Sequence, residues 1–166
     1  MQPRTKERVH QAALSPLEDQ ILHFPLEGLL PDDCQFALNT ALGTLCLIGS
    51  APDDSCPRML AEQQFTASEL CVLLPILRAY PHHCPYEVTL ASFTSGGRVT
   101  SDNVAWAQQR LAQAKEEGYW DQEMRPVRNI LSRARLKMRH LGVEISSIIE
   151  TGHILMQLPD RKRLQS

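Results

Sequence analysis

The 166-residue sequence predicts an α+β domain, and three observations lead to this fold class. Residues 34–65 contain short β-like apolar runs separated by turn residues. Residues 66–140 carry apolar side chains at helical spacing, and residues 143–155 have the pattern of two short strands joined by a turn. Strands and helices that occupy separate blocks of a sequence are typical of α+β folds.

Near the N-terminus, Ser15 and Pro16 are typical of a helix start, because serine caps a helix and proline suits its first turn. Pro25 predicts that this helix ends near Phe24, since proline cannot continue a helical hydrogen-bond ladder. We therefore expect residues 1–33 to form an N-terminal extension with one short helix.

Residues 34–160 are expected to form the main domain. The runs 35–38 and 43–48 predict two strands divided by turn residues, and a further strand is expected at 58–62. The intervening residues 51–57 contain two prolines and two aspartates and predict a loop.

The helical block starts at Thr66, where Glu69 stands at the capping-box position of a helix that runs to about Arg78. Pro75 lies inside this helix and is expected to kink it or to shift its end. A second helix is expected to begin at Pro85.

The segment 94–123 then separates these helices from a basic helix further on. Ser101 or Asp102 is expected to cap a polar helix over 103–117, which Gly118 ends. Its narrow apolar stripe comprises Val104, Ala107, Leu111 and Ala114.

Between Met124 and Val143 the chain has six Arg or Lys residues and no acid. On a helix, the apolar residues of this segment share one face and several polar ones share another. The apolar face comprises Val127, Ile130 or Leu131, Ala134 and Met138, and the polar face Arg128, Ser132, Arg135 and Arg139. A helix with a cationic face, followed by a short hairpin, suits insertion into a DNA major groove beside the phosphates.

The charge distribution agrees with a binding surface in the C-terminal part of the chain. The net charge is −2, but residues 1–66 hold nine acids against four bases and residues 67–166 hold ten acids against thirteen bases. The acidic excess therefore lies away from the basic helix.

Three motifs, in the right order over about 90 residues, resemble the DNA-binding domain of the OmpR/PhoB winged-helix regulators. Residues 65–74 are similar to the first helix of that family. Its recognition helix, V-x-x-x-I-S-R-L-R-x-K-L, is matched by Val127, Leu131, Ser132, Arg133, Arg135, Lys137 and Met138. Its wing is similar to Ile145, Ser147, Ile148, Gly152, His153 and Leu155.

This resemblance implies a winged helix-turn-helix fold with an N-terminal antiparallel β-sheet, a recognition helix at about 125–140 and a C-terminal β-hairpin wing at 143–156. The segment 94–123 is then an enlarged helical insert before the recognition helix, and residues 161–166 form a basic tail. Residues 1–33 are too few for the receiver domain that such regulators usually carry, so we expect none in this chain.

The tip of the expected wing departs from the family's pattern. Ile149 stands where an arginine commonly enters the minor groove, and Glu150 stands where glycine is usual. Phosphates repel a carboxylate. Either the wing stands off the DNA, or Arg161, Lys162 and Arg163 supply the missing positive charge.

We therefore expect a transcription regulator that binds double-stranded DNA sequence-specifically, with RNA polymerase and a second copy of the chain as candidate partners. Asn129 is suited to adenine, and Arg128 or Arg135 to guanine, because these side chains fit the base edges in bidentate fashion. The candidate DNA-binding residues are Arg125, Arg128, Asn129, Ser132, Arg133, Arg135, Lys137, Arg139, His153, Arg161, Lys162 and Arg163. The alternative is a winged-helix module that binds a protein, such as RNA polymerase or a replication factor, without sequence-specific DNA readout.

Trp106, Tyr119 and Trp120 are candidate partner-binding residues. The corresponding loop of the resembling family can contact RNA polymerase, which favours an enlarged insert as an interaction surface. The alternative is that the insert packs on its own domain and that these aromatic side chains belong to the core.

Catalytic and metal-binding functions are not expected. His82, His83 and Cys84 are adjacent, but a zinc site needs three or four ligands, and a plain turn between helices fits this position better. No Gly-rich phosphate-binding loop and no paired-carboxylate motif occurs, so we expect neither an enzyme nor a cofactor.

The five cysteines include no C-x-x-C pair, and an odd number favours reduced thiols in a cytoplasmic protein. The residues near the start lack the apolar core of a signal peptide, and no apolar run approaches 18 residues. We therefore expect no membrane span.

Overall fold

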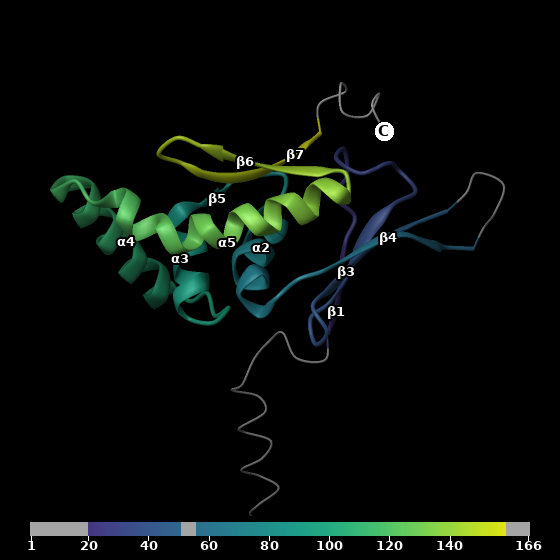
Figure 1. Ribbon diagram of the computed structural model, residues 1–166, viewed down its shortest axis with the longest axis horizontal. Helices are drawn as coiled ribbons and strands as arrows, with labels where there is room; N and C mark the ends of the chain where they lie inside the picture. Colours follow the sequence, from purple (N-terminus) through teal and green to yellow (C-terminus); the bar gives the residue numbers. More distant parts are fainter. Residues whose placement is uncertain (1–19, 51–55, 159–166) are drawn as a thin grey trace, which may run out of the picture.

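A four-stranded antiparallel sheet forms one end of the molecule in the computed structural model, which describes residues 20–50 and 56–158 (Figure 1). Each strand pairs with the next one along the chain, in the order β1-β2-β3-β4. The strands are β1 (Ile21–Phe24), β2 (Gln35–Asn39), β3 (Thr44–Gly49) and β4 (Arg58–Gln64). The three strands expected between residues 35 and 62 are thus confirmed.

The prediction of a helix that ends near Phe24 is wrong for the residues that the structure describes, because Ile21–Phe24 forms strand β1. Its register places Phe24 opposite Phe36 of β2, and Leu22 and Phe24 are the half-buried residues of the strand. Exposed and half-buried side chains alternate along Ile21–Phe24, which suits a strand at the edge of β2. This tertiary pairing overrides the helix-start signal of the preceding residues. Residues 15–19, where that signal lies, are outside the described residues. The sheet therefore begins inside the segment expected to be an extension.

Within residues 56–158 four helices follow the sheet, and the first of them starts as expected. They are α2 (Ala67–Ala79), α3 (Tyr86–Thr94), α4 (Ser101–Glu117) and α5 (Trp120–His140). At the start of α2, the backbone N–H of Glu69 donates to the Thr66 hydroxyl over 3.2 Å, and the backbone N–H of Thr66 donates to the Glu69 carboxylate over 2.9 Å. This capping box is confirmed. The helix continues past Pro75 to Ala79.

The helix expected in the segment 94–123 is present as α4, but its cap differs. Thr100 caps it by accepting a hydrogen bond from the backbone N–H of Asn103, so the expected cap at Ser101 or Asp102 is wrong. Gly118 ends the helix in the left-handed conformation at φ +83°, as expected. Of the predicted stripe, Ala107, Leu111 and Ala114 are buried and Val104 is partly buried.

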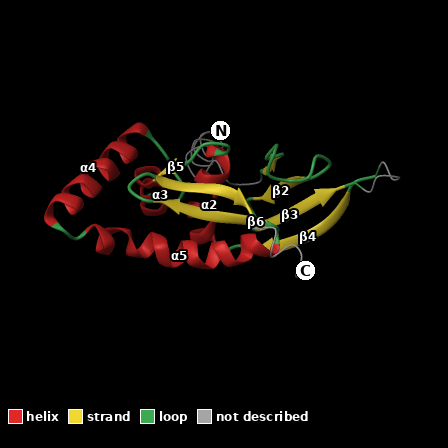
Figure 2. Cartoon of the chain, turned by 90° about the horizontal axis from the view of Figure 1, so that it is seen from above, coloured by secondary structure: helices red, strands yellow, loops and turns green. Residues whose placement is uncertain are grey.

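The basic helix is longer than expected, since α5 begins at Trp120 rather than near residue 125. Its buried face comprises Met124, Val127, Leu131, Ala134 and Met138, in agreement with the predicted apolar face. This face packs against α2 and α3, and α4 also contacts α5. Figure 2 shows α5 running along one side of the molecule with α4 at its end.

A hairpin completes the chain after α5, as expected. It comprises β6 (Val143–Ile148) and β7 (Gly152–Gln157), and the short strand β5 (Cys84–Pro85) pairs with β7 to give the order β5-β7-β6. At Gly152 a Cβ atom would lie 2.1 Å from the backbone oxygen of Cys84, so only glycine permits this close approach of β7 to β5. The Tyr86 hydroxyl donates to the Ile148 backbone oxygen over 2.6 Å and holds the end of β6 to α3.

One apolar cluster joins the two sheets through the helices. Phe36, Leu38 and Leu45 of the first sheet belong to the same cluster as Leu73 and Ile145 of α2 and β6. The fold is α+β, with α5 and the hairpin side by side across the front of the molecule (Figure 1). Across residues 20–50 and 56–158, no helix combines the length and apolar character that crossing a membrane requires.

Candidate nucleic-acid interface

One face of α5 points away from the core and carries mostly polar side chains, with one leucine among them. The exposed residues of this face are Arg125, Asn129, Arg133, Leu136 and His140, spaced by three or four residues. Neither Arg125 nor Arg133 has a hydrogen bond or an ion pair with any residue that the structure describes. Their charges are therefore available to an external ligand.

Arg128 and Ser132 are exposed on the side of α5 that faces the hairpin tip. Arg128 Nη2 lies 2.8 Å from Asp121 Oδ1, and its guanidinium lies 5.2 Å from the centre of the Trp120 ring. The Ser132 hydroxyl donates to the backbone oxygen of Arg128 over 2.9 Å. Since Arg128 remains about half exposed, this pair holds the side chain in place without removing it from the surface.

Two of the predicted DNA-binding cations instead bind acids of their own domain. Lys137 Nζ lies 2.6 Å from Glu69 Oε1 and donates to the Gln64 backbone oxygen over 2.7 Å. Arg139 binds both carboxylate oxygens of Glu144, at 2.8 Å and 3.2 Å. The sequence showed no acid in this segment, but folding supplies acids from elsewhere, so Lys137 and Arg139 each have an internal partner that a DNA phosphate would have to replace.

Arg135 has an intermediate position. Its Nη2 donates to the Ser147 hydroxyl over 3.3 Å, and its Nε lies 3.9 Å from Glu144 Oε1. That Nε is buried and makes no hydrogen bond with the described residues. The guanidinium is therefore incompletely satisfied, at the boundary between α5 and β6.

His153 is buried, with an exposed fraction of 2%, so its predicted role as a DNA contact is wrong. Its Nδ1 lies 3.4 Å from the Thr89 hydroxyl, and its ring packs edge-on against Tyr86. Burial, and then the nearby charges of Arg135 and Arg128, lower the pKa of His153 to about 4. The imidazole is therefore neutral near pH 7.

The hairpin tip presents an apolar side chain and a neutralised acid. Ile149 is 87% exposed, and Glu150, with φ +58°, turns its carboxylate to within 2.9 Å of Lys115 Nζ on α4. The sequence left open whether the tip stands off DNA or is assisted by residues 161–163. The structure shows a third possibility, in which Lys115 of α4 offsets the negative charge of Glu150. Residues 161–163 lie outside the described part of the chain.

The three predicted partner-binding aromatics have different environments. Trp106 is 43% exposed on α4, with the Arg110 guanidinium 5.1 Å from its ring centre. Trp120 is partly buried and packs edge-on against Tyr86, with ring centres 5.2 Å apart. Tyr119 is half-buried at the turn between α4 and α5. Trp106 alone of the three is largely open to solvent.

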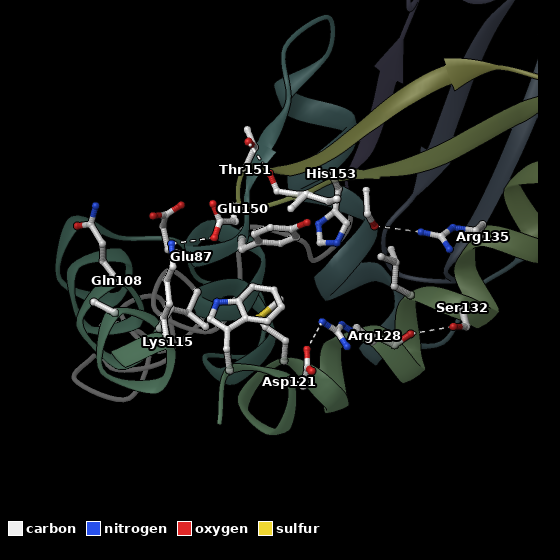
Figure 3. Close-up of a pocket in the computed structure, with 18 residues that line it drawn as sticks. Glu87, Gln108, Lys115, Asp121, Arg128, Ser132, Arg135, Glu150, Thr151 and His153 are labelled. Atoms are coloured by element: carbon white, nitrogen blue, oxygen red, sulfur yellow. Dashed lines mark hydrogen bonds and ion pairs between the residues drawn. The ribbon is translucent and has the colours of Figure 1, made fainter. Parts of the chain in front are cut away.

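A groove of about 780 Å³ lies between the start of α3, α4, α5 from Trp120 to Arg135, and the hairpin tip (Figure 3). Sequence reasoning missed this groove and the contributions of Tyr86, Glu87, Ser147 and Thr151 to it. These residues come from α3 and the hairpin, and no local pattern predicts a site that four elements assemble.

None of the five cysteines, all of which lie within the described residues, forms a disulfide. His82 and His83 are exposed whereas Cys84 is buried, so the three do not point to a common position. Across the described ranges, no group of three His, Cys, Asp or Glu side chains is placed to hold a metal ion.

Comparison with family models, with curated proteins and with solved structures finds no match to this chain. The function is therefore argued from the geometry above.

Proposed function

We propose that this chain binds double-stranded DNA as a transcription regulator, with a winged helix-turn-helix arrangement in which α5 is the recognition helix and the β6–β7 hairpin is the wing. The α+β architecture is compatible with this arrangement, because a long amphipathic helix is followed directly by an antiparallel hairpin. A helix of α5's width fits the major groove of B-DNA.

The observation that carries the proposal is the pair of arginines on the outer face of α5 that have no partner within residues 20–50 and 56–158. Arg125 and Arg133 are exposed and lie two helical turns apart, with Asn129 between them. Arginine and asparagine are the side chains that bind guanine and adenine edges in bidentate fashion. Neither Arg125 nor Arg133 forms an ion pair with an acid among the described residues, so this face keeps its positive charge.

The other cations of α5 have supporting tasks in this proposal. Arg128 and Ser132 lie beside the hairpin and are placed to contact a phosphate that passes between helix and wing. Lys137 and Arg139 fix the helix on its own domain through Glu69 and Glu144. The positive charge that faces DNA is thus smaller than the sequence predicts, and it is concentrated in the N-terminal two thirds of α5.

The test is a fluorescence anisotropy titration of the full chain with a mixed-sequence duplex at several salt concentrations. We expect affinity to fall steeply as salt rises. The double variant Arg125→Ala/Arg133→Ala should flatten the slope of log K against log salt by about 1 for each phosphate that the variant no longer neutralises. Asn129→Ala, tested on a selected duplex, is expected to cost about 1–3 kcal/mol and to relax one base position.

Arg78→Ala is the matched control, because it removes an exposed arginine from α2 and leaves α5 intact. It should leave both affinity and salt slope unchanged. Equal DNA binding by the double variant and the control, with both folded, would refute the proposal.

A second candidate is a protein-interaction module without sequence-specific readout. Leu136, which is 59% exposed on the same face of α5, favours this candidate, since an apolar side chain contributes little to a phosphate-lined surface. DNA binding that is weak and insensitive to salt, together with loss of partner binding in Leu136→Ser, would select it. RNA polymerase and a second copy of the chain are the partners to test.

A further inference from the structure

The groove between α4, α5 and the hairpin tip has the dimensions of a small-molecule site. Its volume of about 780 Å³ falls within the range of roughly 300–1,000 Å³ that is usual for such sites. Figure 3 shows its side chains converging from the two helices and the hairpin. The DNA-binding proposal uses its edge at Arg128 and Ser132 but leaves its interior without a role.

The interior is lined by aromatic and aliphatic side chains. Tyr86 packs edge-on against Trp120 on one side and against His153 on the other, with ring centres 5.2 Å and 4.9 Å away. Leu111 and Met124 belong to the same lining. These rings form one continuous aromatic wall of the groove, and a ligand ring can pack on it, because edge-to-face and offset ring contacts are the favoured arrangements of aromatic pairs.

The charges of the groove are unevenly placed. In Figure 3, Arg135 and the Arg128–Asp121 pair lie toward one end, whereas Glu87 and Glu150 lie toward the other with Lys115. The charges at the second end include the Lys115–Glu150 pair. The first end thus has two guanidiniums against the one carboxylate of Asp121 among the lining residues, and this excess positive charge attracts an anion.

Arg135 is the cation of this groove that is least satisfied by its own protein. Its Nε is buried and has no hydrogen bond with the described residues, and its nearest carboxylate, 3.9 Å away on Glu144, already forms the two-bond pair with Arg139. This Nε is closed to solvent, so a ligand carboxylate would bind the part of the Arg135 guanidinium that the groove exposes, and charge-assisted hydrogen bonds of this kind are strong.

His153 is a second polar side chain at this end of the groove. It is 2% exposed and lines the groove, and its Nδ1 lies within hydrogen-bond distance of the Thr89 hydroxyl. Burial lowers its pKa most, and the charges of Arg135 and Arg128 lower it further. An anion bound at this end would offset these charges and raise the pKa of His153.

We propose that this groove binds a small aromatic carboxylate, with the carboxylate at Arg135 and Arg128 and the ring against Tyr86 and Trp120. The ligand lies between α5 and the hairpin tip, so its binding couples to the relative placement of these two elements. The binding itself does not depend on the proposed DNA function, and the two can fail separately.

The test measures binding of four probes to the full chain by isothermal titration calorimetry. Phenylacetate carries the ring and the charge, phenylacetamide the ring alone, phenethylamine the ring with the opposite charge, and dimethyl phosphate an anion without a ring. We expect phenylacetate to bind, and each of the other three to bind about tenfold more weakly or less, which is the scale of one charge-assisted hydrogen bond or one buried ring.

Two variants place the binding in the groove. Arg135→Gln is expected to weaken phenylacetate binding about tenfold, while Arg78→Gln, which changes an exposed arginine of α2 outside the groove, leaves it unchanged. Ala112→Trp projects from the exposed side of α4 into the groove and is expected to abolish binding without touching the core. It therefore tests the proposal even if Arg135→Gln fails to fold.

A ligand-dependent rise in the pKa of His153, measured by NMR titration, is the third expected result. The proposal is overturned if phenylacetate shows no binding up to about 10 mM, if phenylacetamide or phenethylamine binds as tightly, or if Ala112→Trp binds normally. Equal binding of dimethyl phosphate would also overturn it, because the groove would then be a phosphodiester site that belongs to DNA recognition.

Discussion

Lys137 Nζ on α5 lies 2.6 Å from Glu69 Oε1, the carboxylate that closes the capping box of α2. The same ammonium donates to the Gln64 backbone oxygen and lies 5.3 Å from the centre of the Phe65 ring. One lysine thus connects the recognition-helix candidate to the first helix and to β4. Because the Glu69 side chain is almost fully buried, this contact fixes the orientation of α5 on the domain.

Lys137→Met is expected to lower the free energy of unfolding by about 2 kcal/mol, because it leaves a buried carboxylate without its cation. Urea unfolding followed by circular dichroism measures this loss. Arg133→Met removes a charge of the same sign from the exposed face and should change stability by less than about 0.5 kcal/mol.

DNA titrations of the same two variants give the opposite order. Lys137→Met should retain the salt slope of the wild type, whereas Arg133→Met should flatten it. A stable Lys137→Met protein with weakened DNA binding would return Lys137 to the DNA-binding surface.

His153 predicts an acid-sensitive fold. The folded protein keeps its imidazole neutral down to about pH 4, while the unfolded chain binds a proton below about pH 6.5. The unfolded state therefore gains protons first as the pH falls. The stability that this group confers is complete above pH 6.5 and is lost between about pH 6.5 and 4, by roughly 3 kcal/mol.

Urea unfolding of wild type and His153→Phe at pH 7 and at pH 4.5 isolates this contribution, because every other titrating group is common to both proteins. The variant should lose less stability on acidification. Arg135→Gln should raise the pKa of His153 in an NMR titration, since one of the charges that lower it is gone. Identical pH profiles for wild type and His153→Phe would contradict the prediction.

The two tryptophans should respond differently to truncation. Trp120→Ala removes a ring packed on Tyr86 and is expected to cost about 2 kcal/mol of stability. Trp106→Ala removes a half-exposed ring and should cost less than about 1 kcal/mol. If α4 binds a partner, Trp106→Ala should also lower association, measured by sedimentation on a duplex with two adjacent sites. A large stability loss in Trp106→Ala would place this ring in the core instead.

The cysteines should differ in reactivity by their burial. Cys84 is 1% exposed, and burial raises its pKa to about 11, whereas Cys56 is exposed. Because the thiolate is the reactive species, Cys84 should react with a disulfide reagent at least about a hundredfold more slowly than Cys56. Peptide mapping after timed modification checks the order. Rapid modification of Cys84 in the folded protein would contradict its burial.

Most elements were predictable because their signals are local. The capping box at Thr66, the glycine at 118 and the apolar face of α5 each involve residues within a few turns of one another. Strand β1 was not predictable in this way, since Ile21–Phe24 is held by pairing with β2 and not by its own sequence. The early start of α5 at Trp120 likewise depends on packing against Tyr86 of another helix.

The sequence predicts the helix that carries the candidate site, but it does not predict which of the helix's cations form ion pairs. The sequence shows six cations in the segment that becomes α5, and it does not show which acids meet them. Glu69 lies 68 residues from Lys137, and Glu144 lies just beyond the stretch that contains no acid. The groove depends on the placement of α4 beside the hairpin tip, which no pattern within either segment encodes.

Gly152 divides the hairpin into two parts with different freedom to evolve. Its backbone is pressed against the oxygen of Cys84 so closely that any side chain would separate β7 from β5. The tip before it, from Ile149 to Thr151, is bounded by solvent and by the groove, and Ile149 itself is almost fully exposed. Selection can therefore retune what the tip touches, one substitution at a time, while the mounting of the hairpin on the domain stays fixed.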